Sequence, residues 1–182
     1  AELCDGAMHR LADFTQDTIY LSERSGLEAV CANRALGDFP IKSLSLDIGI
    51  RRPLGVGAGG LAILCSLSPA EAQSVVQANA HRYEKFAKFT VDFLCDAIAE
   101  GRSRNYSFLD GAVTPGTASM GVAFPPHNPV AAISVAAISD RLQPERREAI
   151  AQQMHREVRK IVALMEAAKP PNGLAGVGDL GR

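Results

Sequence analysis

Aromatic residues are scarce in this sequence, and tryptophan is missing altogether. Phenylalanine and tyrosine contribute 5% of the 182 residues. A surface that stacks nucleic acid bases needs several exposed rings, so the composition argues against such a surface. The sequence also lacks an apolar run of the roughly 18 residues that a membrane-spanning helix needs. We therefore expect neither a base-stacking platform nor a membrane-spanning helix.

The charge balance argues against nucleic acid and acidic membranes as direct partners. Nineteen basic residues stand against twenty acidic ones, which gives a formal net charge of −1 at pH 7. Proteins that hold nucleic acid or acidic lipid by general electrostatic attraction carry a clear positive excess. We therefore expect no direct attraction of these residues to DNA or to a membrane.

Cysteine and histidine do not occur in the patterns of local metal sites. The cysteines Cys4, Cys31, Cys65 and Cys95 lie about thirty residues apart, without the paired spacing of zinc clusters or compact disulfide frameworks. The histidines form no HxxxH or HExxH pair, so no metal site is predicted. The pattern predicts reduced, mostly buried thiols in a cytoplasmic protein without a metal ion.

Common catalytic signatures are missing too. Ser119 lies in the segment 116–121, GTASMG, which lacks the GxSxG turn of a nucleophilic serine. No pair of carboxylates stands out as acid and base, and Asp110 precedes Gly111 in a pattern typical of a turn. We therefore expect a protein that is not an enzyme and that holds no cofactor.

Glycine, by contrast, is concentrated in one stretch that precedes an apolar, helix-compatible run. Residues 51–67 read RRPLGVGAGGLAILCSL, with four glycines within six positions. Glycine lets the backbone approach other groups closely. A helix start adds free N–H groups and the positive end of the helix dipole. The stretch therefore predicts a site that holds a small anion by its main chain.

The same glycines satisfy the GxGxxG pattern of dinucleotide-binding proteins. That pattern needs a buried strand before it and an acidic residue about twenty positions later, at the end of the next strand. Here Arg51, Arg52 and Pro53 precede the glycines, and proline and two charges are unfavourable in a central strand. A nucleotide- or phosphate-using enzyme built on the Gly55–Gly60 loop is therefore the alternative, and not the preferred interpretation.

Periodicity predicts a mixed fold. The first half is expected to contain a helix over 1–16, a hairpin of strands 18–24 and 27–34, and a third strand over 43–48. Three helices follow: one ends near residue 66, one starts at Ser68, and one covers about 90–100. Strands over 106–110, 117–124 and 129–137 and a final helix from Gln143 complete the chain. Helices and strands do not alternate one by one, so the order predicts an α+β fold with an antiparallel sheet. We expect one domain over residues 1–168 and a flexible tail over 169–182.

Two of the predicted strands each carry one face of small side chains. These faces consist of Ser119, Gly121 and Ala123 on one strand and of Ala132, Ser134 and Ala136 on the next. If the faces align, the sheet contains a hollow with two hydroxyl groups. Alternatively, a helix packs closely against the small residues, as close-packed interiors allow.

Four segments together resemble the effector-binding domain of IclR-family bacterial transcription regulators. They are residues 9–12, 18–22, 52–62 and 130–135, and the match runs in order along residues 1–168. The resemblance implies a GAF-like fold, which is a curved antiparallel sheet of about six strands flanked by helices. It also implies a winged helix-turn-helix domain that precedes these residues, and the helix that begins almost at the first residue agrees with that expectation.

The effector implied by the resemblance is a small organic or aromatic acid. The main-chain positions that would bind its carboxylate correspond to Gly57, Ala58 and Gly59. Polar positions on the last two strands correspond to Ser119 and Ser134. A further serine of the family pattern is Ala136 in this chain.

The remaining implied positions form the walls of the site. Apolar wall positions correspond to Leu44 and Leu54, and an acidic position falls at or next to Asp110. Another wall position is Arg52 in this chain, which departs from the pattern. Arginine is suited to hold a carboxylate by two parallel hydrogen bonds. The departure indicates either a more acidic or larger effector, or an arginine that is simply exposed.

By the same resemblance, the domain forms a homodimer or homotetramer and contacts DNA only through the other domain. A ligand changes DNA binding only as far as it favours one arrangement of the oligomer over another. Three hypotheses follow: an effector-sensing domain, an enzyme that uses the glycine loop for a nucleotide or phosphate, and a purely oligomerising module. The resemblance favours the first.

Overall fold

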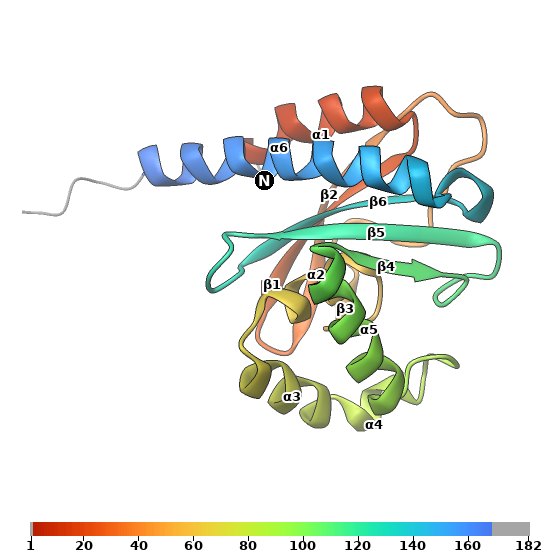
Figure 1. Ribbon diagram of the computed structural model, residues 1–182, viewed down its shortest axis with the longest axis vertical. Helices are drawn as coiled ribbons and strands as arrows, with labels where there is room; N and C mark the ends of the chain where they lie inside the picture. The colour runs from red at the N-terminus through yellow and green to blue at the C-terminus, as the bar shows by residue number, and fades with distance from the viewer. Residues whose placement is uncertain (1, 169–182) are drawn as a thin grey trace, which may run out of the picture.

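A single curved sheet with helices on both faces organises the chain (Figure 1). The computed structural model describes residues 2–168. The strands are β1 (Thr18–Ser25), β2 (Glu28–Leu36), β3 (Arg51–Pro53), β4 (Ser107–Asp110), β5 (Thr117–Phe124) and β6 (Ala131–Ile138). They lie in the order β3-β2-β1-β6-β5-β4, and every neighbouring pair is antiparallel. The predicted α+β fold with an antiparallel sheet of about six strands is confirmed.

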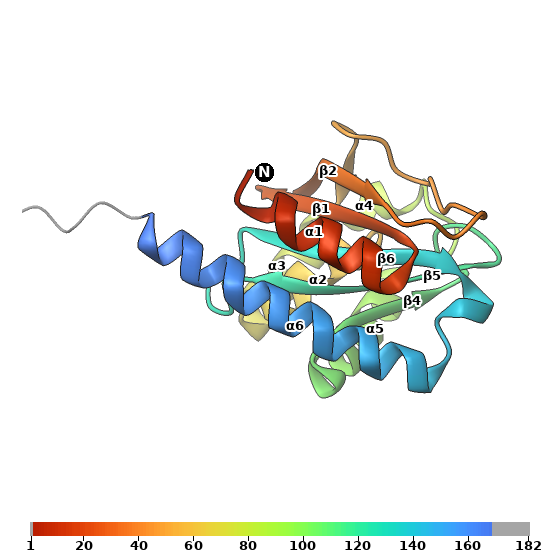
Figure 2. The same cartoon turned by 90° about the horizontal axis from the view of Figure 1, so that it is seen from above.

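Helices cover the two faces of the sheet unequally. They are α1 (Glu2–Thr15), α2 (Ala58–Ser66), α3 (Pro69–Ala78), α4 (Ala80–Tyr83), α5 (Val91–Arg104) and α6 (Pro144–Ala167), with a 3₁₀ turn, η1 (Ser139–Arg141), before α6. Figures 1 and 2 show α1 and α6 side by side on one face. Helices α2 and α5 cover the other face, and α3 and α4 lie beyond them. No helix within residues 2–168 is long and apolar enough to cross a membrane.

The side-chain alternation of the central strands separates two hydrophobic cores. On β6, Ile133 and Val135 pack with α1 and α6, whereas Ala132 belongs to the core formed with α2, α3 and α5. Successive residues of a strand point to opposite faces, so the large side chains of β6 share one face and the small ones share the other. The sheet therefore presents a smooth, small-residue surface to α2.

Local sequence signals act as expected at α3. The Ser68 side chain accepts a hydrogen bond from the Glu71 amide at 3.2 Å, and Pro69 occupies the first turn. Serine and proline at these positions satisfy and pre-organise the start of a helix. The expected tail, residues 169–182, lies outside the described residues.

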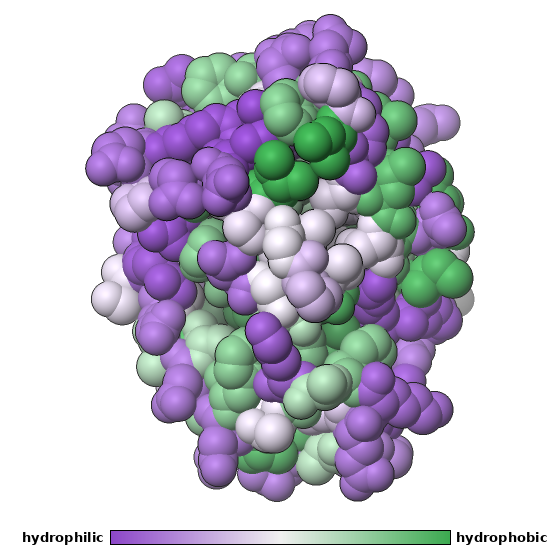
Figure 3. Space-filling view, turned by 90° about the vertical axis from the view of Figure 1, so that its right-hand side faces the viewer, coloured by the Kyte–Doolittle hydropathy of each residue, from purple (hydrophilic) through white to green (hydrophobic). Residues whose placement is uncertain are grey.

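The predicted strand over 43–48 is wrong. Residues 37–50 have no regular secondary structure, and the third strand is the three-residue β3 at the sheet edge. The alternation of Leu44, Leu46 and Ile48 favoured a half-buried strand, but Leu44 and Ile48 are exposed. Figure 3 shows a small, strongly apolar patch among hydrophilic residues on one face of the molecule. Leu46 alone packs on the sheet, against Tyr20, Cys31 and Ala136. The alternation favoured a strand because it does not reveal that no neighbouring strand pairs with this segment.

A buried glutamate ties α6 to α1. The Glu157 side chain is fully buried and accepts hydrogen bonds from Arg10 Nη2 at 2.7 Å and from Lys160 Nζ at 2.8 Å. Burial alone would raise its pKa, but the hydrogen bonds from Arg10 and Lys160 outweigh that effect and hold the pKa of Glu157 below its ordinary value. The ionised carboxylate is therefore part of the α1–α6 contact.

This contact predicts a stability that depends on pH. Because the folded-state pKa of Glu157 is depressed, the contribution is present above the unfolded-state pKa near 4.5 and is lost as pH falls through the folded-state value. We expect the unfolding free energy of Glu157→Gln to fall less steeply than that of the wild type between about pH 5 and pH 3. Urea denaturation across that range measures the two slopes. Glu100→Gln, at an exposed ion pair of α5, should keep the wild-type slope, and equal slopes for Glu157→Gln and wild type would contradict the assignment.

Candidate functional site

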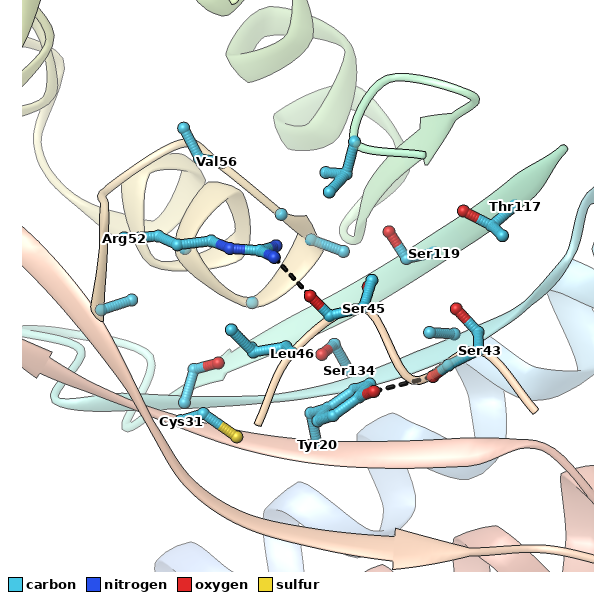
Figure 4. A pocket seen from close by; sticks show the side chains of 18 of the residues that line it. Tyr20, Cys31, Ser43, Ser45, Leu46, Arg52, Val56, Thr117, Ser119 and Ser134 are labelled. Atoms are coloured by element: carbon cyan, nitrogen blue, oxygen red, sulfur yellow. Dashed lines mark hydrogen bonds between the residues drawn. The ribbon is translucent and has the colours of Figure 1, made fainter. Parts of the chain in front are cut away.

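A small cavity lies between the sheet, the first turn of α2 and the segment 37–50 (Figure 4). Its walls come from β1, β2, β3, β5 and β6, from the start of α2, and from Ser43, Ser45 and Leu46 of that segment. The space open to the centres of water molecules is about 50 Å³, and one water needs roughly 10–15 Å³ by this measure. The cavity therefore suits a compact ligand.

The floor of the cavity is the small-residue face of β5 and β6. Cross-strand pairing sets Ser119 opposite Ala136 and Gly121 opposite Ser134, so the two predicted faces do align. The alternative of a helix packed closely against the small residues also applies, because α2 packs directly over Gly121. The helix thus covers one end of the small-residue face, while the cavity extends over Ser119, Ser134 and Ala136.

Two glycines allow α2 to approach the sheet so closely. A Cβ on Gly121 would lie 2.8 Å from the Ala58 carbonyl oxygen, and a Cβ on Gly59 would lie 2.6 Å from Ser22 Oγ. The same Ala58 carbonyl accepts a buried hydrogen bond from Ser107 Oγ at 2.6 Å. These contacts fix the first turn of α2 at the edge of the cavity.

The start of α2 leaves main-chain donors unused. Gly57 caps the helix with a φ of 90° and supplies no side chain, and the first intrahelical bond is from Leu61 N to Gly57 O at 3.0 Å. Within residues 2–168, no hydrogen bond occupies the amides of Ala58, Gly59 or Gly60. These amides and the helix dipole favour a negatively charged group at this end of the cavity.

Hydroxyl groups supply further polar contacts. Ser134 is only 6% exposed, and its hydroxyl has no hydrogen-bond partner within the described part of the chain. Ser119 projects from β5 on the same side of the sheet (Figure 4). The Ser134 hydroxyl is open to the cavity, where a ligand or a water molecule can bond to it. Ser134 therefore points to a ligand or water that completes its hydrogen bonding.

Arg52 extends from β3 into the cavity (Figure 4). Its Nη2 donates to the Ser45 carbonyl oxygen, and its Nη1 lies 3.9 Å from the position that a Cβ on Gly57 would occupy. Burial lowers the pKa of Arg52, but a guanidinium in a protein stays protonated at neutral pH. Of the two interpretations that the sequence left open, the structure therefore disfavours a simply exposed arginine.

Sequence reasoning missed several residues of the cavity. Tyr20 and Ser22 of β1 line it, and the Tyr20 hydroxyl donates to the Ser43 carbonyl oxygen at 2.7 Å. Burial raises the pKa of Tyr20, so this hydroxyl remains a donor at neutral pH. Cys31 and Thr117 also contribute to the walls. The period-2 pattern of β1 puts Tyr20 and Ser22 on one face, but nothing in the sequence placed β1 beside β6.

Seven of the positions implied by the resemblance meet at this cavity: Arg52, Gly57, Ala58, Gly59, Ser119, Ser134 and Ala136. The structure does not bring three others to its lining. Leu44 is exposed, whereas its neighbour Ser43 is buried and lines the cavity. Leu54 is fully buried in the core beneath α2, and Asp110 is exposed and accepts a hydrogen bond from Ser139 Oγ at 2.6 Å.

The context of the glycine pattern differs from that of a dinucleotide site. The strand before it, β3, is a short edge strand with an exposed Arg51, whereas the dinucleotide pattern follows a buried parallel strand.

Within residues 2–168, no three His, Cys, Asp or Glu side chains are grouped so as to hold a metal ion.

Solved structures of similar fold are bacterial regulators. The IclR protein of Thermotoga maritima is 18% identical with a TM-score of 0.81, over 90% of this chain and 67% of that chain. An IclR-family transcriptional regulator from Rhodococcus sp. is 23% identical with a TM-score of 0.71, over 90% and 62%. The C-terminal domain of a transcriptional regulator from Vibrio cholerae is 18% identical with a TM-score of 0.69, over 87% and 94%. At these identities the likeness establishes the fold.

Sequence comparison establishes the family. Comparison with curated proteins gives no match, but the family model described as bacterial transcriptional regulator IclR C-terminal matches residues 1–163. That match covers most of the chain and agrees with the fold of the structural relatives. The chain therefore belongs to the IclR family of bacterial transcriptional regulators, of which it is the C-terminal effector-binding domain.

Proposed function

We propose that residues 1–168 sense a small organic acid by binding it in the cavity without transforming it. The observation that carries the proposal is the convergence of the unused α2 amides and the Arg52 guanidinium on one small cavity. None of the described residues that line this cavity is acidic. An anion is the ligand that such an arrangement of donors stabilises.

The acid acts on DNA binding through the arrangement of an oligomer. DNA contact belongs to a domain outside these residues, and the effector shifts the balance between two arrangements of a homodimer or homotetramer. Helices α1 and α6 are the couplers, since α1 lies beside α6 and an ion pair joins Arg10 of α1 to the buried Glu157 of α6. This route requires the acid to bind one arrangement more tightly than the other.

A thermal-shift screen over small organic acids tests the proposal. At 100 times its dissociation constant, a ligand of the folded state stabilises it by about 2.7 kcal/mol, which corresponds to roughly 5–10 °C for a domain of this size. We expect at least one acid to give a saturable rise in melting temperature and to remain chemically unchanged after hours of incubation. The uncharged primary amide of the same acid should give no such rise. Consumption of the acid, or shifts produced by nucleotides alone, would favour the enzyme alternative, and no shift with any small molecule would favour a purely oligomerising module.

A further inference from the structure

Two groups of hydrogen-bond donors face the cavity, the first-turn amides of α2 and the Arg52 guanidinium. The α2 N-terminus acts as about half a positive charge, and the Arg52 guanidinium adds a full one. The only hydrogen bond of Arg52 in the described part of the chain goes to the Ser45 carbonyl, which is uncharged. A guanidinium has five N–H donors, so most of those of Arg52 are free for a ligand.

The cavity wall selects against an aromatic ligand. Tyr20 is the only aromatic residue in the described lining, and its hydroxyl is already bonded to Ser43. The remaining wall combines hydroxyl groups with small apolar side chains, and the Ser134 hydroxyl has no partner among the described residues. Polar groups that a ligand buries without pairing weaken its binding. Short ligands with several oxygen atoms meet this requirement better than rings.

A monocarboxylate leaves part of this site uncompensated. If both of its oxygen atoms bind the α2 amides, the N–H groups of Arg52 that face the cavity are left without an acceptor. Removing solvent from an unpaired charge is unfavourable, whereas a carboxylate paired with a guanidinium forms two parallel charge-assisted hydrogen bonds. The arrangement thus favours a ligand that brings a second anionic group to Arg52.

We propose that the effector is a short aliphatic dicarboxylate, with one carboxylate on the first-turn amides of α2 and the other on Arg52. This inference rests on the proposed function and specifies its ligand class. Arg52 is then the residue that distinguishes diacids from monoacids. The amides of Ala58 and Gly59 bind one carboxylate of either class of acid.

Matched acid pairs test the ligand class on the full chain. Isothermal titration compares succinate with butyrate and glutarate with valerate, so that each pair differs only in the second carboxylate. We expect the diacid to bind about tenfold more tightly or better, which is the effect of one charge-assisted hydrogen bond. Arg52→Gln should bring the diacid affinity down to that of the monoacid, and Arg52→Lys should retain part of the preference.

Arg51→Gln is the matched control. Arg51 is the neighbouring residue on the same edge strand, but it is exposed and pairs with Glu28 at 2.7 Å, away from the cavity lining. Its replacement should leave the diacid preference unchanged. If Arg52→Gln fails to fold by circular dichroism, the wild-type comparison of acid pairs decides the question alone.

The possible results separate this inference from the proposed function. Equal affinity of diacid and monoacid overturns the dicarboxylate inference and leaves acid sensing intact. The same holds if the diacid preference survives Arg52→Gln, or if benzoate binds while all aliphatic diacids fail. Failure of every acid overturns both. A diacid preference that Arg52→Gln abolishes and Arg51→Gln preserves supports both.

Discussion

Asp17→Ala is expected to lower the free energy of unfolding by about 3 kcal/mol, because it removes the anion that holds two arginines in place. The Asp17 side chain is 1% exposed and accepts from Arg141 Nε at 2.7 Å and from Arg146 Nη2 at 2.9 Å. Both arginines also donate to the Thr15 carbonyl oxygen. The cluster joins the end of α1 to the start of α6.

The loss is large because the arginines cannot turn freely into solvent. Their side chains are 22% and 33% exposed, and the Arg141 guanidinium lies 3.7 Å from the centre of the Phe39 ring. Without Asp17, two partly buried positive charges would face each other with no anion between them.

Thermal unfolding measures this effect. For a domain of this size, about 3 kcal/mol corresponds to a fall in melting temperature of roughly 6–12 °C. The control is Glu100→Ala, which removes an ion pair with Arg104 whose acidic side chain is 66% exposed, and it should change stability by less than about 0.5 kcal/mol. A melting temperature for Asp17→Ala as high as that of the control would refute the role of the cluster.

Gly121→Val is the second change with a large expected effect, because it pushes α2 away from the sheet. The Cβ alone would lie 2.8 Å from the Ala58 carbonyl oxygen and 3.0 Å from Ser107 Oγ, and valine adds two methyl groups. Backbone must move to make room, so we expect a loss of about 3 kcal/mol. Displacing the first turn of α2 also moves the amides of Ala58 and Gly59, so acid binding should be lost.

The measurement combines denaturation with titration of an acid found in the screen. Gly121→Ala should give a smaller loss of both stability and affinity than Gly121→Val. Gly6→Ala on α1 is the control, since its Cβ would meet only the flexible end of Arg10, and alanine favours a helix over glycine by up to about 1 kcal/mol. The packing argument fails if Gly121→Val binds the acid as tightly as the wild type.

Local patterns predicted the parts of this fold that depend on neighbours in sequence. The small faces of β5 and β6 could be read from period-2 alternation, and Ser68 with Pro69 marked the start of α3. The segment 43–48 showed the same alternation and yet is not a strand. Alternation reports which side chains share a face, but it cannot show whether a neighbouring strand is available to pair.

The cavity was predictable only in part for the same reason. Main-chain donors at Ala58 and Gly59 follow from a glycine-rich helix start, which is local information. Tyr20 and Ser22 reach the site because β1 pairs with β6, and that register joins distant parts of the chain. Whether Arg52 points inward depends on β3 lying at the sheet edge beside β2, which the sequence alone did not determine.

The central position of β1 and β6 has a consequence for synthesis of the protein on the ribosome. The β1–β2 hairpin emerges early, but its inner edge pairs only with β6, which begins at Ala131, 113 residues after the start of β1 at Thr18. At roughly 5–20 residues per second, that edge waits about 6–23 s for its partner. During this interval the nascent chain exposes an unpaired strand edge, a known route to misassembly. Protection by chaperones is therefore most valuable to this domain before residue 131 has left the exit tunnel.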